Sequence, residues 1–234
     1  MSAPFAPPKG VTLHTDLQQG SAAWLHARLG LMTASELKLV VTPTLKMADN
    51  DKTRAHLYEL LAQRVTNHVE PQFQSYDMER GNFDEEHARA KYAETYAPVI
   101  ECGFITNDRW GFTLGYSPDG LVGDDGLIEC KSRAQKWQMQ TLVEYVAKDV
   151  IPPDFIIQVQ AGLLIAEREW CDFISYSGGM LMPTVRVYPD PEIQDAIVTA
   201  ATAFEERLNE KLEIYNGLLA SDARLVPTER LIYL

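Results

Sequence analysis

The sequence is short of cysteine, of long apolar runs and of positive charge. Its three cysteines, Cys102, Cys130 and Cys171, lie far apart and fit no C-x-x-C or Cys/His zinc spacing, so a disulfide framework or a zinc site has little support. No run approaches the ~18 apolar residues of a membrane-spanning helix, and the start, MSAPFAPPKG, has neither a basic leader nor the apolar stretch of a signal peptide. We therefore expect no contact with a membrane and a protein that stays in the cytoplasm, a reducing compartment.

Basic side chains are outnumbered, with 21 Lys and Arg against 33 Asp and Glu and a net charge of −12. Nonspecific binding to nucleic acid depends on Lys and Arg that release counterions from phosphates, so this balance argues against a surface that coats DNA. An acidic shell can still surround a locally basic channel, and part of the acidic surplus can serve as metal ligands. The residues of the site must therefore identify the partner.

Length and composition predict one folded domain. A chain of 234 residues, of which 46% are apolar, can bury a sizeable core. The proline-rich start contains little that can pack, so residues 1–12 are expected to form a flexible arm and residues 13–234 a single domain.

Hydrophobic periodicity predicts a helical first part and a mixed second part. Thr33 and Glu36 have the spacing of a capping box, which predicts that a second helix starts soon after the first. Three strand-like runs after Pro98 predict a meander, with a turn-rich segment between the second and third runs. The predicted helices span 20–30, 53–67, 78–97, 134–148, 153–168 and 191–219, and the predicted strands span 99–106, 111–117, 126–131, 169–177 and 182–189. This order favours an α/β fold with a mixed central sheet flanked by helices.

The stretch YSPDGLVGDDGLIECKS, from residue 116 to residue 132, concentrates charged side chains between apolar flanks. Alternate side chains of a strand share a face, so Glu129 and Lys131 project together while Cys130 points into the opposite layer. If the chain turns back through GDDG, Asp119 lies beside Glu129. Two carboxylates with an ammonium group at their edge suit Mg²⁺ or Mn²⁺, which accept one or two protein carboxylates together with substrate phosphate oxygens. The chemistry predicted for such a site is hydrolysis of a phosphodiester, with Lys131 orienting or deprotonating the attacking water.

A hairpin tip that carries surface charge is the plain alternative. Pro-Asp occurs three times in the chain and Glu-x-Lys twice, so each half of the pattern alone is close to what chance supplies. The combination favours a site, because Glu129 and Lys131 lie in an apolar strand, where unpaired charge is costly.

The string SPDG(x)8ECK resembles the PD-(D/E)xK nuclease motif, and three further stretches are similar to the phage lambda-type exonucleases of viral recombination. These stretches are WLHARLGLMTASE, RGNFDEEHAR and PPDFIIQVQAGLLI, and they occur in the family's order over roughly residues 20–177. The chain departs from the family's pattern at SRAQ, where a turn with proline is common, and at Arg80, where an aromatic residue is common. The resemblance implies a restriction-endonuclease-like core.

For the metal site, the resemblance implies Asp119, Glu129 and the main-chain carbonyl of Cys130 as ligands. It implies two Mg²⁺ ions in each active site, with Mn²⁺ as a substitute, and Lys131 at the attacking water. Glu85 would hold water or the second ion, although a helical ion pair with Arg89 is an equally good interpretation from the residues alone.

A glutamine of the site would position a water molecule or a phosphate. The resemblance points to Gln158, but Gln160 lies two residues further on, on a different helical face, and the choice between them stays open. For the phosphates of DNA, the resemblance implies a pocket of Arg28, Ser35 and Ser117. Arginine offers a planar fork for phosphate, which makes this assignment physically sensible.

The function implied is that of an Mg²⁺-dependent 5′→3′ exonuclease that degrades one strand of linear double-stranded DNA and leaves 3′ overhangs for recombination. The resemblance also implies a ring-shaped homotrimer and a single-strand annealing protein as partner. The alternatives are a PD-(D/E)xK endonuclease or RecB-type nuclease domain and, from another class, a DNA-end-binding protein whose catalytic site has lapsed. Intact Asp119, Glu129 and Lys131 argue against the last of these.

Overall fold

The computed structural model describes residues 7–70 and 76–230, and its strands form two four-stranded sheets. The first sheet has the order β1-β3-β4-β2 and the second the order β5-β6-β7-β8. Each sheet contains both parallel and antiparallel pairs, since β2–β4 and β6–β7 are parallel and the other pairs are antiparallel. The strands are β1 (Val11–His14), β2 (Met32–Thr33), β3 (Phe104–Asn107), β4 (Leu114–Tyr116), β5 (Gly120–Val122), β6 (Gly126–Ser132), β7 (Trp170–Tyr176) and β8 (Thr184–Val187).

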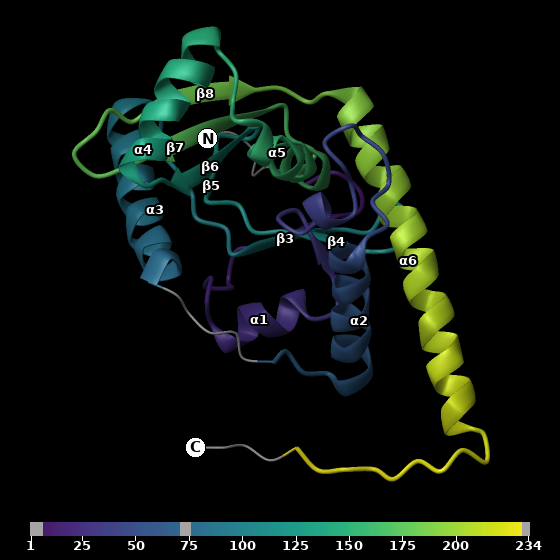
Figure 1. Ribbon diagram of the computed structural model, residues 1–234. Helices are drawn as coiled ribbons and strands as arrows, with labels where there is room; N and C mark the ends of the chain where they lie inside the picture. Colours follow the sequence, from purple (N-terminus) through teal and green to yellow (C-terminus); the bar gives the residue numbers. More distant parts are fainter. Residues whose placement is uncertain (1–6, 71–75, 231–234) are drawn as a thin grey trace.

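Helices flank these sheets, as the α/β prediction requires (Figure 1). Alternate residues of β6 enter different clusters: Leu127 packs with the α5 side of the sheet, whereas Ile128 and Cys130 pack with Ala88 and Tyr92 of α3. Helices α3 and α5 therefore cover opposite faces of β6 and β7. The helices are α1 (Ala22–Arg28), α2 (Asp51–Thr66), α3 (Tyr76–Thr95), α4 (Gln135–Gln140), α5 (Pro153–Ala166) and α6 (Pro191–Leu219).

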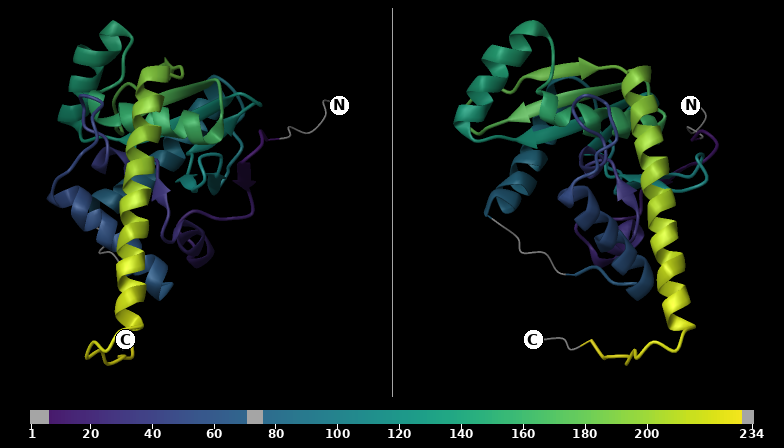
Figure 2. Two further views of the ribbon diagram at one scale, coloured as in Figure 1. Left: turned by 90° about the vertical axis from the view of Figure 1, so that its right-hand side faces the viewer. Right: turned by 45° about the vertical axis from the view of Figure 1, so that its right-hand side comes forward.

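The longest helix, α6, runs down one side of the molecule and packs against α2 and α5 (Figure 2). Asp190 begins it by accepting hydrogen bonds from the amides of Glu192 and Ile193. Its buried face includes Ile197, Phe204 and Leu208, at the spacing that the sequence predicts for one helical face.

The predicted meander is wrong in its third strand. β3 and β4 pair antiparallel, but β6 pairs with β5 and β7 in the second sheet. β5 (Gly120–Val122) comes from the segment predicted as a turn, and Gly120 allows the approach that this requires, since a Cβ there would lie 2.2 Å from Val99 Cγ1. The chain turns back after β5 at Gly123, whose φ of +56° is in the region that glycine tolerates.

Two predicted helices are shorter or more irregular than expected. Glu36 accepts hydrogen bonds from the amide and hydroxyl groups of Thr33, at 2.9 and 2.6 Å, but only a single 3₁₀ turn follows, η1 (Leu37–Leu39). The segment predicted as one helix over 134–148 divides into α4, a π-helical turn η2 (Thr141–Tyr145) and a 3₁₀ turn η3 (Val146–Lys148).

The flexible arm predicted for residues 1–12 can be compared with the structure only from residue 7 onward. Residues 1–6 lie outside the described residues, and strand β1 begins at Val11, inside the range predicted as flexible. In the described ranges, no single helix is long and apolar enough to cross a membrane. The helical segments 135–148 and 153–166 pass that test of length and composition as a pair, with a bend of 66° between them.

Candidate active site

The two predicted carboxylates converge where β5 and β6 form a hairpin. Asp119 precedes β5, and its Oδ2 accepts a hydrogen bond from the amide of Cys130 at 2.5 Å. Because Cys130 follows Glu129 in β6, this contact fixes Asp119 beside the strand that carries the second carboxylate. The Cys130 side chain is buried on the α3 side, as the alternation of a strand predicts.

Glu129 is buried, with 1% of its surface exposed, and three side chains bind its carboxylate. Lys131 Nζ lies 2.7 Å from Oε1, and the Gln158 amide of α5 donates to the same oxygen. On the other side, the Tyr116 hydroxyl of β4 donates to Oε2 at 2.8 Å. A buried carboxylate with this many partners is not the tip of a solvated hairpin, so the plain alternative for this stretch does not hold.

The charges of the site strongly perturb one another. Burial, and then the charges of Glu129 and Glu85, raise the pKa of Asp119 well above its usual value. Burial also raises the pKa of Glu85, with Lys131 opposing the shift. For Lys131 itself, burial lowers the pKa, but Glu129 and Asp119 outweigh it, and the pKa is raised overall. Burial and mutual repulsion thus disfavour the ionised forms of these carboxylates. A bound cation would favour them, so the arrangement is typical of a cation-binding site.

Helix α3 supplies Glu85 and Arg89 at the edge of this cluster. Arg89 Nη1 donates to the main-chain carbonyl of Asp119 at 2.9 Å, and its Nε lies 3.9 Å from Glu101 Oε1. Glu85 is half-buried, and its charge acts on Asp119 and on Lys131. The charges of Lys131 and Arg89 lower the pKa of Glu85, while those of Glu129 and Asp84 raise it, and the role of Glu85 as holder of water or a second ion stays a prediction.

Arg28, at the end of α1, anchors the predicted phosphate pocket. Its Nη1 donates to Ser117 Oγ at 2.9 Å, its Nη2 lies 3.4 Å from Thr33 Oγ1, and its guanidinium stacks 4.3 Å from the Trp24 ring. Ser35 joins the same group, with its Oγ 3.3 Å from Thr33 Oγ1. Burial lowers the pKa of Arg28, although the nearby Glu36 charge opposes this shift, so a substrate anion would find a cation that has already lost part of its water.

A single cavity of about 1310 Å³ connects the pocket to the carboxylates. Arg28 and Ser35 line it, and Glu85, Arg89 and Asp119 line it as well. A phosphate held at Arg28 and a phosphodiester at Asp119 can therefore belong to one bound strand.

The residues present fit a divalent metal ion in the mode that the sequence predicts. Asp119 and Glu129 provide hard carboxylate oxygens, and Cys130, which follows Glu129 in β6, is held to Asp119 through its main-chain amide. Across residues 7–70 and 76–230, no three His, Cys, Asp or Glu side chains form a closed metal cluster. Two carboxylates with a carbonyl need none, because Mg²⁺ usually keeps several waters.

The contacts of two residues of the site are not predicted from the sequence. Trp24, which looks like a core residue in the sequence, donates from Nε1 to Ser117 Oγ at 3.0 Å and to the Gly103 carbonyl at 2.9 Å. Tyr116 looks like any aromatic residue of a buried strand. The structure also separates the two glutamines: Gln158 reaches Glu129, whereas Gln160 is buried and bonds to the main chain of Tyr188 and Asp190 at 2.8 Å each.

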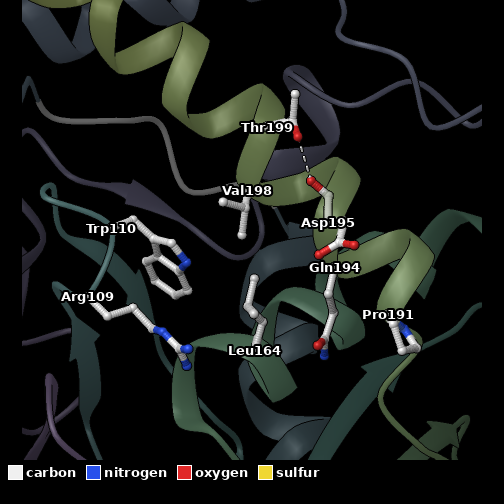
Figure 3. A pocket seen from close by; sticks show the side chains of 8 residues that line it. All are labelled: Arg109, Trp110, Leu164, Pro191, Gln194, Asp195, Val198 and Thr199. Atoms are coloured by element: carbon white, nitrogen blue, oxygen red, sulfur yellow. Dashed lines mark hydrogen bonds between the residues drawn. The ribbon is translucent and has the colours of Figure 1, made fainter.

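A smaller cavity of about 550 Å³ lies elsewhere, where the loop after β3 meets α5 and the start of α6 (Figure 3). Figure 3 shows Trp110 and Leu164 on its apolar side and Asp195 of α6 opposite them. Arg109, which also lines it, forms an ion pair with Glu167 at 2.6 Å. The predicted site residues do not line this cavity.

Comparisons with known proteins identify a family and similar exonuclease structures. The profile of the family described as YqaJ-like viral recombinase domain matches residues 23–169. The crystal structure of an alkaline exonuclease from Laribacter hongkongensis is 32% identical, covers 86% of this chain and 98% of its own, and superimposes with a TM-score of 0.74. The same enzyme in complex with dAMP gives the same identity and coverage, with a TM-score of 0.75.

A more distant structure supports the fold alone. A phage-related exonuclease from Haemophilus somnus 129PT is 15% identical, with 78% of this chain and 96% of that chain covered and a TM-score of 0.50. No protein with a curated description matches the sequence.

Proposed function

The chain belongs to the family of YqaJ-like viral recombinase domains, with a PD-(D/E)xK-like exonuclease fold, and we propose that it is a divalent-metal-dependent 5′→3′ exonuclease. It would degrade one strand of linear double-stranded DNA and leave 3′ single-stranded overhangs for recombination by strand annealing. The observation that carries this proposal is the convergence of Asp119, Glu129 and Lys131, together with a cavity that both Asp119 and Arg28 line.

In this proposal Asp119, Glu129 and the Cys130 carbonyl hold Mg²⁺, or Mn²⁺ in its place, and Glu85 holds water or a second ion. When bound, the metal would polarise the phosphodiester and lower the pKa of a water molecule. Lys131 orients that water or, in its neutral form, accepts its proton, and Gln158 keeps Glu129 in place through the hydrogen bond to Oε1.

The phosphate pocket supports the proposed polarity. Arg28 and Ser35 line the cavity, and Ser117 accepts a hydrogen bond from Arg28. A terminal 5′-phosphate bound at these residues would anchor the end of the strand. The adjoining carboxylates would then face the first phosphodiester linkage. A charged guanidinium binds a phosphate more strongly than a hydroxyl, because charge-assisted hydrogen bonds are roughly twice as strong as neutral ones.

The assembly and the partners are proposed from the family resemblance. A homotrimeric ring threaded by DNA would collect the scarce basic side chains on its inner wall despite the net charge of −12. A single-strand annealing protein would take up the 3′ overhang, in the cytoplasm of a bacterial host.

The test compares DNA ends. Linear duplex labelled at the 5′ or the 3′ end, and the same duplex as a nicked circle, are incubated with Mg²⁺ or with EDTA. We expect early release of the 5′ label as mononucleotide from linear DNA, late release of the 3′ label, and no activity in EDTA. Cleavage within the unbroken strand of the nicked circle would instead identify the endonuclease alternative, and tight binding to ends without cleavage would identify a lapsed site.

A further inference from the structure

The Tyr116 hydroxyl is the least expected contact of Glu129. It donates to Oε2 at 2.8 Å from strand β4, which belongs to the first sheet, whereas Glu129 belongs to the second. Tyr116 is 1% exposed and Glu129 is also 1% exposed, so water does not compete for this bond. The contact therefore fastens the metal-binding strand to the neighbouring sheet.

The ring of Tyr116 has little freedom to move. It lies against Gly162 of α5, where a Cβ atom would come 2.7 Å from Tyr116 Cζ and 3.0 Å from both Cε atoms. A Cβ atom essentially never lies as close as 2.7 Å to another, non-bonded heavy atom, so glycine at this position makes the space that the ring fills. The direction of the hydroxyl toward Glu129 is consequently fixed by packing.

The hydrogen bonds on Glu129 are divided unequally between its two oxygens. Oε1 receives both Lys131 and Gln158, whereas Oε2 receives Tyr116. Each carboxylate oxygen has about two lone pairs, so in this arrangement Oε1 is occupied and Oε2 has one lone pair left. Oε2 is therefore the oxygen that can ligate a cation, and Tyr116 sets its orientation.

Tyr116 also stands next to the phosphate pocket in the chain. Tyr116, the last residue of β4, donates to Glu129, and the next residue, Ser117, accepts from Arg28 at 2.9 Å and from Trp24 at 3.0 Å. Two residues further on, Asp119 reaches Cys130. One short segment thus holds the phosphate pocket and both carboxylates at fixed separations.

We propose that Tyr116 is a positioning residue of the metal site, which orients Glu129 Oε2 toward the cation and keeps it in register with the phosphate pocket. This proposal rests on the proposed metal-dependent function. Hydrogen-bond partners of ligating carboxylates commonly change metal affinity by about 10- to 100-fold when they are removed.

The test replaces Tyr116 by phenylalanine and measures Mg²⁺ binding in the absence of DNA. Calorimetric titration and the rise of Tm with Mg²⁺ concentration should both give a dissociation constant about 10- to 100-fold weaker than that of the parent protein. Cleavage at saturating Mg²⁺ should return to within a few fold of the parent rate, because no group that touches the substrate is lost.

Tyr92→Phe is a matched control. Tyr92 is also 1% exposed, and its hydroxyl donates to the buried carboxylate of Asp172 at 2.6 Å, on the α3 face of the sheet rather than the face of Glu129. The Tyr92→Phe variant should be destabilised in the same way as Tyr116→Phe, but it should bind Mg²⁺ with the affinity of the parent protein. A second variant, Gly162→Ala, leaves the hydroxyl in place but displaces the ring, and it should weaken Mg²⁺ binding as well.

The outcomes separate this proposal from the proposed function. If the parent protein binds Mg²⁺ and cleaves DNA while Tyr116→Phe binds Mg²⁺ equally well, the positioning role is wrong and the function stands. If Tyr92→Phe weakens Mg²⁺ binding as much as Tyr116→Phe, the effect is one of general stability, and the role is again wrong. A parent protein that neither binds nor requires a divalent cation would overturn the proposed function and the role of Tyr116 together.

Discussion

Arg28 Nη1 donates to Ser117 Oγ over 2.9 Å, and this bond joins helix α1 to the segment that leads from β4 to Asp119. The guanidinium is held on its flat side by Trp24, 4.3 Å from the ring centre. A residue fixed in this way recognises an anion with little loss of conformational freedom.

We expect Arg28→Ala to slow digestion of 5′-phosphorylated duplex more than digestion of 5′-hydroxyl duplex. A charge-assisted phosphate contact of ~1.5–3 kcal/mol corresponds to about 10- to 150-fold, which a gel assay with both substrates resolves. Arg54→Ala is the control. Arg54 is exposed on α2, and its guanidinium also lies over an aromatic ring, with Cζ 5.8 Å from the ring centre of Tyr58. If Arg28→Ala retains the parent's discrimination between the two ends, Arg28 does not sense the end.

Asp119→Asn should stabilise the metal-free protein at neutral pH. In the unfolded chain the Asp119 carboxyl ionises near its ordinary pKa, whereas in the folded protein its pKa is raised by burial and by Glu129 and Glu85. Between these two values the folded protein holds more protons than the unfolded chain, so its stability falls as pH rises through that window. The variant lacks this contribution, and the smaller fall that remains belongs to Glu85, whose pKa is also raised.

The measurement for Asp119→Asn is Tm against pH in EDTA, repeated with Mg²⁺. In EDTA the variant should have the higher Tm at neutral pH, and Mg²⁺ should raise the Tm of the parent but hardly that of the variant. A variant that is less stable than the parent in EDTA at neutral pH would contradict the raised pKa.

Lys131 should give the cleavage rate an alkaline rising limb. The Glu129 and Asp119 carboxylates raise the pKa of Lys131, so its neutral form, which can accept a proton, becomes available only as pH increases. Lys131→Ala should lose on the order of 10²-fold in rate, flatten this rise and keep nearly the parent's affinity for DNA. Rates at saturating Mg²⁺ over a range of pH, together with DNA binding in EDTA, test this. Weak DNA binding with a normal rate once bound would make Lys131 a contact of the DNA backbone.

The two glutamines of α5 offer a matched pair. Gln158 donates to Glu129, so Gln158→Ala should reduce the cleavage rate with little change in Tm. Gln160 is buried and bonds to the main chain of Tyr188 and Asp190, so Gln160→Ala should lower Tm, by leaving buried groups unpaired, with little change in rate at a temperature where the protein is folded. The reverse pattern would assign the site glutamine to Gln160.

The periodicity of the sequence predicts which side chains share a face of a strand or helix, but not which strands pair or how the sheets meet. The alternation in β6 places Glu129 and Lys131 on one face and Cys130 on the other, and the periodicity of α6 gives its buried face. β5 escapes prediction because a three-residue strand between two turns has no pattern, and its existence depends on pairing with β6. The contact of Tyr116 with Glu129 escapes for a related reason, since it depends on how two sheets meet.

The most direct test of the account is the cleavage of 5′-phosphorylated linear duplex by the parent protein and by Glu129→Gln, each with Mg²⁺ and with EDTA. Glutamine keeps the size of the side chain but removes the charge that a metal ligand supplies, and circular dichroism would verify that the variant is folded. The account predicts release of 5′ mononucleotides by the parent only in Mg²⁺, and no release by the variant in either condition. Equal cleavage by the folded variant in Mg²⁺, or by the parent in EDTA, would contradict the assignment of Asp119, Glu129 and Lys131 as a metal-dependent nuclease site.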